Sequence, residues 1–447
     1  MPEARANAFP RKRFFLEMFT RDISFEDCIL DLIDNSIDSL VRTREINPAA
    51  EILRPRSRAS DATQLPLISV ALNEREILIA DNCGGIPLKL LENEVFSFGH
   101  GKDARLGQLG AYGIGLKRAM FKLASVFEIQ SQTASGGFSA KFNVDDWAAN
   151  DADLSDWTIP FTRLERNPDL PENGTRIRFT SLREEVRMRL RDGAFMGKLC
   201  SGIAGTYSLF LEDSVRVEVN GARVDPQDLP LGSSREITPG QSDFTKGTVK
   251  IRIIAALAAR KEEEWAYERA GWYVLCNGRV VLSADKSELT GWGEGLPRFH
   301  SKYNGFVGVA VFRSPDPLAL PWTTTKRGLN RESPVFQSAR TEMVVLARPI
   351  ISFLNDMYRG QLVEEPVERA MAERVTTANV RELALKKPGP ARIERPVAVQ
   401  HTTARVQYDA QLADLERVRR SLRKPKWSPN KLGRYTFEHY LKTECAE

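Results

Sequence analysis

The chain has 447 residues, of which 42% are hydrophobic and 28% charged, and its 64 Lys and Arg against 59 Asp and Glu give a net charge of +5. This is a soluble globular composition for roughly two to four domains, and it excludes a histone-like or wholly disordered chain. No apolar run reaches the ~18 residues of a membrane span, and the first residues lack the apolar core of a secretory signal. The five cysteines lie far apart without a CxxC pair, which favours a reduced cytoplasm and argues against a disulfide scaffold or a cysteine zinc site.

The first module is predicted to be α+β. A basic, Phe-rich arm (residues 1–22) precedes a helix that begins after Ser24, a suitable N-cap, and continues to about Leu40. A polar loop is expected at residues 43–65, and six glycines between residues 96 and 115 indicate a mobile loop. A second helix is expected from about Ile114 toward Leu123. Strands are predicted at residues 67–72, 76–80, 126–130, 138–142 and 175–180.

A second module is predicted to begin near residue 206 and to be followed by a charged tail from about 360. Its expected strands are residues 215–219, 249–254, 272–276 and 306–312, and a helix is expected at 335–354. Lys386–Pro390 has the composition of a linker, and a short helix near 410–422 and an aromatic stretch at 435–440 follow it. The expected domains are therefore residues 1–205, 206–360 and 361–447.

The first predicted helix carries two stripes of side chains. The apolar stripe, which should face a core, consists of Leu30, Ile33, Ile37 and Leu40. The polar stripe consists of Asp31, Asp34, Asn35 and Asp38. Three carboxylates on one face repel one another, so they form either an ordinary solvated face or the neighbourhood of a cation. Mg²⁺ suits such a place, because it prefers oxygen ligands and usually joins one or two protein oxygens to substrate phosphates.

Two further motifs lie where other elements end or begin. Asp81–Pro87 follows a predicted strand. Its carboxylate can accept a hydrogen bond from an exocyclic amine, and its glycines allow the backbone to approach a flat ligand closely. A plain turn also explains this motif. Gly107–Lys117 is rich in glycine and precedes a helix, whose free N–H groups are a natural seat for phosphate. It matches neither the GxxxxGK[ST] pattern nor a clear dinucleotide fingerprint.

In their order and spacing the motifs resemble those of the GHKL superfamily, named for gyrase, heat-shock chaperone, histidine kinase and MutL. Asp31–Asp38 resembles its N box, Asp81–Gly85 its G1 box and Gly107–Lys117 its G2 box, and Asn173-Gly174-Thr175 resembles its later Gly-Thr element. The resemblance spans roughly residues 12–205 and is nearest to the Microrchidia-like branch and its bacterial relatives. It implies a Bergerat-type two-layer sandwich, with a mixed, largely antiparallel sheet under helices, that binds ATP. An α+β transducer-like domain and a helical basic tail would follow.

The resemblance also implies roles for single residues. Asn35 would coordinate a Mg²⁺ ion that bridges the phosphates, Asp81 would bind the adenine amine, and Thr175 would assist it through water. Backbone amides would wrap the triphosphate, at Gly110, Gly113 and Gly115. The other residues expected at the nucleotide are Asp38, Gly85, Ile86, Tyr112, Leu116 and Lys117.

Residues 96–112 would form a lid over ATP. Lys102 and His100 are candidate phosphate contacts within it, and the simple explanation of His100 as a polar residue of the lid is favoured.

The catalytic position departs from the family pattern. Gyrase- and MutL-like members place Glu four residues before the Asn as general base, and this chain has Asp31 there. Because its carboxylate is one methylene shorter, it must sit closer to the attacking water or act through a second one. We therefore expect ATP binding with slow hydrolysis.

A loop of the second module completes the expected site. Pro321–Gly328 resembles the transducer loop with which clamp-type members bring a lysine to the γ-phosphate, and Lys326 would be that lysine. A compact ammonium on a flexible stem suits a sensor of the third phosphate. The alternative is an exposed basic loop.

The tail has a strong charge excess. Residues 386–434 contain 13 Lys and Arg against 4 Asp and Glu, a net charge of +9 that leaves −4 for the rest of the chain. Such a segment can contact nucleic acid phosphates, or it can be a solvated helix that docks on an acidic surface.

These features predict an ATP-driven conformational clamp, an ATPase that dimerises on ATP and acts on DNA or on a partner protein complex. Roles in DNA transactions or phage defence follow by analogy only. A chaperone-like ATPase with the same site and a nucleotide-sensing module without significant hydrolysis remain as alternatives. A histidine kinase is disfavoured, because no histidine precedes the N box in this sequence.

Overall fold

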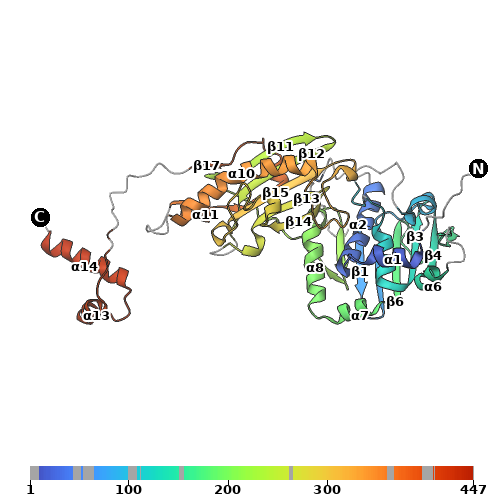
Figure 1. Ribbon diagram of the computed structural model, residues 1–447, viewed down its shortest axis with the longest axis horizontal. Coiled ribbons are helices and arrows are strands. Elements are labelled where there is room, and N and C mark those ends of the chain that lie inside the picture. Colours follow the sequence, from blue (N-terminus) through green and yellow to red (C-terminus); the bar gives the residue numbers. More distant parts are fainter. Residues whose placement is uncertain are drawn as a thin grey trace, which may run out of the picture. The chain divides into compact units, whose positions relative to one another are not determined.

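The computed structural model describes residues 10–43, 52–53, 65–98, 108–110, 112–150, 156–260, 265–359, 367–394, 406 and 408–445. The chain divides into two compact units, residues 1–395 and 396–447. The first unit contains two large sheets with their helices, and the second contains two helices near the C-terminus (Figure 1).

The N-terminal part of the first unit is built on an eight-stranded sheet in the order β5-β4-β3-β6-β2-β1-β7-β8. Its strands are β1 (Leu67–Leu72), β2 (Glu76–Asp81), β3 (Ala124–Thr133), β4 (Gly136–Asn143), β5 (Thr162–Leu164), β6 (Gly174–Leu182), β7 (Arg216–Val219) and β8 (Ala222–Arg223). Neighbouring strands are antiparallel except β1 and β7, which are parallel. Buried residues alternate with half-buried ones along β1 and β2, so one face of the sheet lies in the core.

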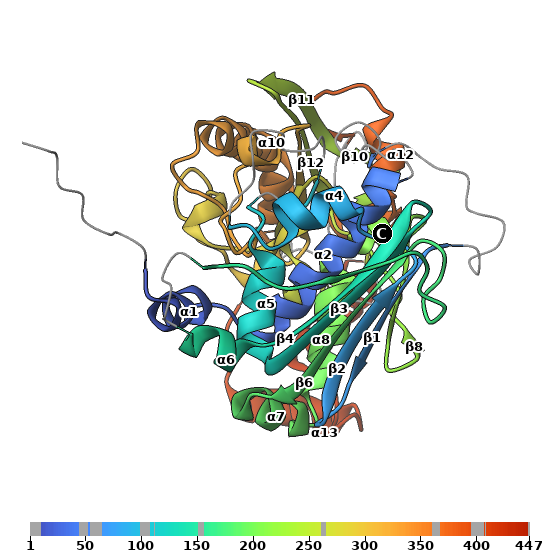
Figure 2. The same ribbon diagram turned by 90° about the vertical axis from the view of Figure 1, so that its right-hand side faces the viewer.

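Helices cover that face and complete a two-layer α+β sandwich, as expected. α2 (Phe25–Thr43) and α5 (Gly115–Leu123) lie side by side over the strands (Figure 2). Ser24 caps α2 as predicted: its Oγ accepts from the Asp27 N–H (3.1 Å) and donates to Asp27 Oδ2 (2.6 Å). The other helical segments of this part are α1 (Lys12–Thr20), α4 (Leu88–Leu90), the π-helical turn η2 (Leu91–Val95), α6 (Val144–Ala149), α7 (Glu184–Arg191), α8 (Phe195–Thr206) and α9 (Ser208–Leu211).

The predicted N-terminal arm is a docked helix where the structure describes it. Lys12 of α1 is buried, and its Nζ donates to the Asn150 carbonyl (3.2 Å) and lies over the Trp147 ring. Phe15 and Phe98 meet edge to face, which ties α1 to the first residues of the predicted lid.

A second, five-stranded sheet follows in the order β11-β12-β15-β13-β14, with α10 (Pro334–Arg359) packed on β11, β12 and β15. Its strands are β11 (Gly240–Lys246), β12 (Val249–Leu257), β13 (Gly271–Cys276), β14 (Arg279–Asp285) and β15 (Phe306–Arg313), and short 3₁₀ turns are η3 (Tyr267–Arg269), η4 (Glu288–Thr290), η5 (Ser301–Tyr303) and η6 (Pro317–Ala319). Three of these strands and the long helix were expected from the sequence. β11 and β14 were not.

The first sheet extends beyond residue 205, where the first domain was expected to end. The strand predicted at 215–219 is β7, and it pairs in parallel with β1 and not with the second sheet. The Asn220-Gly221 turn then leads into β8, which is the edge of the same sheet.

The first unit also includes residues that were expected to belong to the tail. These are α11 (Val367–Glu373), β16 (Thr376–Thr377), α12 (Val380–Ala384) and β17 (Arg392–Ile393), of which β16 pairs with β9 (Gly232–Ser233) and β17 with β10 (Ile237–Thr238). The predicted linker at 386–390 is held in place, because Gly389 and Gln241 exchange two backbone hydrogen bonds of 2.8 and 2.9 Å.

In the second unit the described residues form α13 (Leu412–Ser421) and α14 (Pro429–Glu444). The first corresponds to the helix expected near 410–422, and the aromatic stretch 435–440 lies within the second. None of the helices in the described residues is both long and apolar enough to cross a membrane.

Candidate functional site

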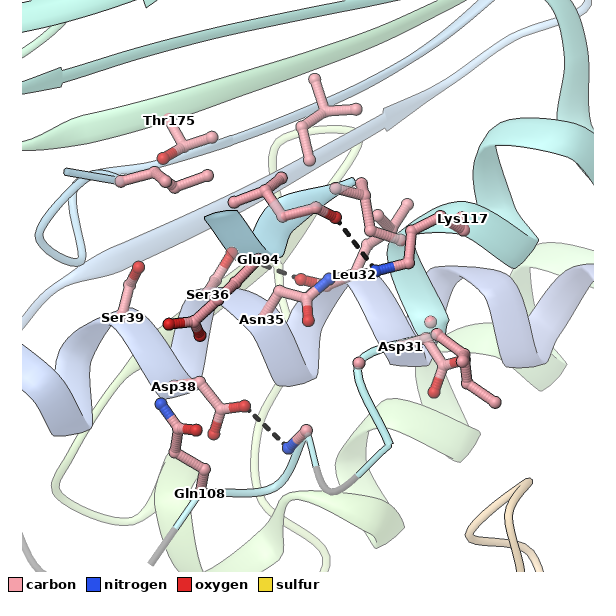
Figure 3. A pocket seen from close by; sticks show the side chains of 18 of the residues that line it. Asp31, Leu32, Asn35, Ser36, Asp38, Ser39, Glu94, Gln108, Lys117 and Thr175 are labelled. Atoms are coloured by element: carbon pink, nitrogen blue, oxygen red, sulfur yellow. Dashed lines mark hydrogen bonds between the residues drawn. The ribbon is translucent and has the colours of Figure 1, made fainter. Parts of the chain in front are cut away.

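The three carboxylates in the polar stripe of α2 are buried, so they do not form a solvated face. The exposed fraction is 7% for Asp31 and Asp38 and 0% for Asp34. Asp31, Asn35 and Asp38 line a pocket between α2, the sheet and the glycine-rich segment (Figure 3). The pocket holds about 1080 Å³ of space, including its opening to solvent.

Most residues of the expected site line this pocket: Asp31, Asn35, Asp38, Asp81, Ile86, Gly110, Tyr112, Gly113, Gly115, Leu116, Lys117, Thr175 and Lys326. The glycine-rich segment, the N box and the end of β2 are therefore brought together as the resemblance implied. Lys102 and His100 lie outside the described residues, as do residues 99–107 of the expected lid.

Gly85 lies next to the pocket lining and has a packing role. Its φ is +69°, and a Cβ there would come within 2.1 Å of the Gln132 carbonyl oxygen on β3. Its own carbonyl accepts from Ser39 Oγ (3.2 Å) and Arg42 Nη2 (2.7 Å). The close approach that requires glycine is thus made to the backbone of β3, and not to a ligand as expected.

Asp81 stands at the end of β2, in register with Thr175 on β6. Its Oδ2 accepts from Ser36 Oγ (2.7 Å) and its Oδ1 accepts from the Cys83 N–H (2.9 Å). Burial raises the pKa of Asp81, and these two hydrogen bonds oppose the rise. An ionised carboxylate accepts about four hydrogen bonds, so acceptor capacity remains for an amine in the pocket.

Asp38 anchors the glycine-rich segment to α2. Its two oxygens accept from the N–H groups of Leu109 (2.6 Å) and Gly110 (2.7 Å). Burial raises the pKa of Asp38 to about 6, and the two amide bonds oppose the rise. A Cβ at Gly110 would lie 2.7 Å from Asp38 Oδ2, so glycine permits this contact.

α5 begins where the glycine-rich segment ends, and its first turn faces the pocket. Its N-cap, Ile114, has no side-chain group to satisfy the first N–H groups of the helix. Lys117, 2% exposed, donates from Nζ to the Val95 carbonyl (3.0 Å, Figure 3). Burial lowers the pKa of Lys117 to about 8. Helix amides and an ammonium group thus meet in one place, a combination that attracts phosphate.

Asp31 lies one helical turn before Asn35 and directly against α5. A Cβ at Gly115 would come within 2.8 Å of Asp31 Cβ, so only glycine fits there without a shift. Burial raises the pKa of Asp31, opposed mainly by the ammonium group of Lys326, whose Nζ lies 3.7 Å from Asp31 Oδ1. A raised pKa makes the ionised carboxylate a stronger base, which suits a group that accepts a proton.

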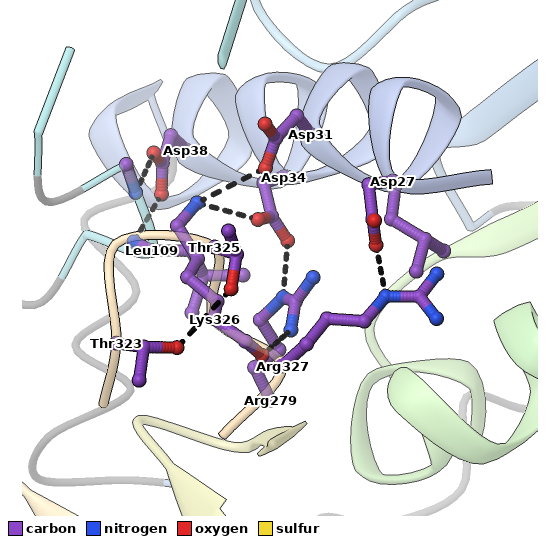
Figure 4. Close-up of polar contacts among 12 residues, drawn as sticks. Asp27, Asp31, Asp34, Asp38, Leu109, Arg279, Thr323, Thr325, Lys326 and Arg327 are labelled. Carbon is purple, nitrogen blue, oxygen red and sulfur yellow. Dashed lines mark hydrogen bonds and ion pairs between the residues drawn. The ribbon is translucent and has the colours of Figure 1, made fainter. Parts of the chain in front are cut away.

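A loop that follows the second sheet contributes Lys326 to this pocket. It sits in a turn with φ of +54°, its N–H donating to the Thr323 carbonyl (2.9 Å), and it is only 6% exposed. Its Nζ donates to Asp34 Oδ2 at 2.6 Å (Figure 4). The adjacent Arg327 pairs with Asp27 at the start of α2. The alternative of an exposed basic loop is therefore wrong for Lys326.

Asp34 is neutralised by the protein itself. Besides Lys326, the Arg279 Nε donates to Asp34 Oδ1 (3.0 Å), and the Tyr207 hydroxyl lies 2.7 Å from the same oxygen. These positive charges hold the pKa of Asp34 below its ordinary value despite complete burial. Magnesium is thus not needed to explain the carboxylate stripe, which corrects part of the argument made from the sequence.

A magnesium site still fits the pocket through Asn35. The described residues contain no group of three or more His, Cys, Asp or Glu side chains that could hold a metal by themselves. Mg²⁺ with nucleotide needs only one or two protein oxygens, because phosphates and water supply the others. The Asn35 amide lies in the pocket within one turn of Asp31 and Asp38, so it can provide such an oxygen (Figure 3).

Sequence reasoning missed several residues of the site. Arg279 and Tyr207 belong to no motif, and they lie 245 and 173 positions from their partner Asp34. Ser36 and Thr324 could have been named, because each lies within a motif that was recognised.

The fold and the site together define an ATP-binding domain of the GHKL type. Residues 23–168 match the family model described as Histidine kinase-, DNA gyrase B-, and HSP90-like ATPase, and this domain of the chain belongs to that superfamily. The match does not single out the Microrchidia-like branch, which stays a prediction. A search of curated proteins finds no match.

Proposed function

We propose that this chain is a conformational clamp that binds ATP with Mg²⁺, hydrolyses it slowly and transmits the state of the nucleotide to its second domain. The observation that carries the proposal is Lys326, a residue of the second domain whose ammonium group lies in the pocket of the first, 3.7 Å from Asp31. A group in this position can respond to the third phosphate and move one domain relative to the other.

Each pocket residue has a part in the proposed reaction. Asp81 accepts a hydrogen bond from the adenine amine, with Thr175 beside it, and Ile86 packs near the base. The amides at Gly110, Gly113 and Gly115 and the charge of Lys117 hold the phosphates. Bound Mg²⁺, held through Asn35, would neutralise phosphate charge.

Asp31 is the proposed general base. It takes a proton from the attacking water, so that ATP and water yield ADP and phosphate. The neighbouring Lys326 favours the ionised form of Asp31 and so opposes the effect of burial on its pKa. Because the Asp side chain is short, the proposed turnover is slow.

Phosphate release tests the enzyme proposal. The wild type should release phosphate faster than Asp31→Asn, while both bind ATP. Equal background rates in the two proteins, with ATP still bound, would favour a nucleotide-sensing module without hydrolysis. Asn35→Ala should remove the magnesium dependence of ATP binding, and an unchanged dependence would reject Asn35 as the ligand.

The partner of the clamp is proposed to be DNA or a protein complex, reached through the tail. α13 and α14 carry basic side chains next to exposed aromatic ones, including Tyr435, Phe437 and Tyr440. ATPase activity with and without duplex DNA across a salt series tests this. Stimulation that disappears at high salt supports phosphate contacts. No stimulation at any salt favours a protein client, as for a chaperone-like ATPase, and light scattering with ATP tests dimerisation.

A further inference from the structure

Asp34 is a completely buried carboxylate with two positively charged partners of different character. Arg279 contacts Oδ1 together with Tyr207, and Lys326 contacts Oδ2. The two cations therefore do not compete for one oxygen, and either contact can open while the other stays closed (Figure 4).

Only one of the two cations faces the nucleotide pocket. Lys326 lines the pocket beside Thr324 and Asp31, whereas Arg279 is 2% exposed and is not part of the lining. A ligand phosphate in the pocket can thus draw away Lys326 and leave Arg279 in place.

Arg279 also holds the backbone of the lysine. Its Nη1 donates to the Lys326 carbonyl at 2.7 Å. Lys326 has a left-handed backbone, which is unfavourable for a residue with a side chain and needs support from its surroundings. This contact lets the Lys326 side chain change partner while its peptide stays fixed.

The energetics of burial explain why a second cation on Asp34 matters. If Lys326 were the only partner of Asp34, its departure would leave an unpaired charge in the interior, which is strongly unfavourable. With Arg279 and Tyr207 still on Oδ1, Asp34 remains neutralised after the lysine leaves. Arg279 thereby lowers the cost of moving Lys326.

We propose that Asp34 is the resting counter-ion of Lys326, that the γ-phosphate of a nucleoside triphosphate displaces it, and that Arg279 is the positioning residue that makes this exchange possible. The inference rests on the proposed function, in which Lys326 senses the third phosphate. It adds a competitor for that lysine and assigns Arg279 and Asp34 to the discrimination between triphosphate and diphosphate.

The measurable quantity is the affinity ratio between a non-hydrolysable ATP analogue with an imido β,γ-bridge and ADP, both with Mg²⁺, determined by calorimetry on the full chain. Asp34→Asn removes the competing charge and should raise the preference for the analogue by about tenfold, within the range of typical coupling between sites. Arg279→Met leaves Lys326 as the only cation on Asp34 and should lower the preference by about tenfold, with ADP affinity unchanged.

The double variant Arg279→Met, Asp34→Asn provides the sharpest comparison. Because residue 34 then carries no charge that retains the lysine, and Asp31 is the same in every variant, the preference lost in Arg279→Met should return. Arg252→Met is the matched control, since Arg252 is also a buried arginine, paired with Asp243 on β11 and outside the pocket lining. It should leave the ratio unchanged.

Failure of this inference can be told from failure of the proposed function. If Lys326→Met leaves the wild-type preference intact, Lys326 is no phosphate sensor and the proposed function fails with the inference. If Lys326→Met abolishes the preference but Asp34→Asn keeps the wild-type ratio, the exchange is rejected and the sensor stands. Should Arg279→Met prove unfolded by circular dichroism, Asp34→Asn alone decides, since it removes the charge without changing the shape.

Discussion

Burial changes the chemistry of several single residues in the pocket, and Lys117 is the plainest case. Its ammonium group is 2% exposed and donates to a neutral carbonyl, and burial lowers its pKa to about 8. The group is therefore close to losing its charge in the pH range where such proteins are studied. Its value for phosphate binding should depend on pH.

We predict that ATP affinity decreases as the pH rises through about 8, because the charged form of Lys117 attracts phosphate and is present below this pKa. In Lys117→Arg the guanidinium stays charged, so the decrease should be absent. Titration of ATP binding between about pH 7.5 and 9.5 measures this decrease. At the lower end of this pH range an ordinary Lys stays charged. The same slope in both proteins would exclude a contribution of Lys117 to phosphate binding.

Asp38 leads to a prediction about stability. Its folded pKa of about 6 lies above the ordinary Asp value of 3.8, so the folded state favours the protonated carboxyl. The stabilising contribution is complete below the unfolded pKa and is lost as the pH rises through the folded one. In the wild type, this group should therefore lower the unfolding free energy by roughly 3 kcal/mol between about pH 4 and 6. In Asp38→Asn this contribution to the fall should be absent.

Urea denaturation at several pH values measures this slope. Asp145→Asn is a useful control, because the pKa of Asp145 is lowered by its hydrogen bond to Arg183 and it titrates below this window. An Asp38→Asn protein with the wild-type slope would show that Asp38 does not titrate there.

Among the helices, α2 and α5 owe their close contact to one glycine. Gly115 opens α5, and a Cβ there would meet the Cβ, Cγ and Oδ2 atoms of Asp31 at 2.8 to 3.0 Å. Any side chain at this position separates the N box from the start of the phosphate-binding helix. The packing of α2 against α5 and the position of the proposed general base thus both depend on the absence of a Cβ atom at Gly115.

We predict that Gly115→Ala destabilises the protein by about 1–3 kcal/mol through overpacking. Its ATP affinity should also fall. Gly202→Ala is the matched control: a Cβ at Gly202, inside α8, meets no atom within 4 Å, so the change should stabilise by about 0.5–1 kcal/mol. Chemical denaturation of the two variants, with ATP titration, checks both. Equal stabilities would show that α2 and α5 adapt freely.

How well the elements were predicted depended on local information. β1 was predicted at residues 67–72 and is found there, because its alternating pattern begins after Pro66 and ends before Asn73. β7 was also recognised as a strand but was assigned to the wrong sheet. Its four residues look the same whether they pair with β1 or with the second sheet, and that choice depends on contacts distant in sequence.

Across the chain, the residues of the candidate site also fall into those that local sequence could predict and those that it could not. The N box, the end of β2 and the glycine-rich segment could be found, because each motif is contiguous and its order was informative. The partners of Asp34 could not: Arg279 comes from a strand that was not predicted, and Tyr207 from the junction of α8 and α9. The sequence indicated a cation beside the Asp stripe but not that the protein supplies it.

The end of the first unit is fastened to the ATP-binding domain by one buried arginine. Arg381 of α12 is 6% exposed, and it donates to the carbonyls of Ile52 (3.0 Å) and Leu209 (2.7 Å) and pairs with Asp213. The segment after α10 therefore returns to the N-terminal part of the first unit.

We predict that Arg381→Leu destabilises the protein by about 3–5 kcal/mol, because it leaves the buried Asp213 carboxylate without its partner. Arg374→Leu is the comparison: Arg374 pairs with Glu236 but its side chain is 60% exposed, so its loss should cost at most about 1 kcal/mol. Denaturation measures both, and limited proteolysis should cleave the segment 367–394 earlier in Arg381→Leu. The double variant Arg381→Leu, Asp213→Leu separates two causes of the instability. If it is no more stable than Arg381→Leu alone, the destabilisation does not arise from the unpaired carboxylate but from the lost packing of α12.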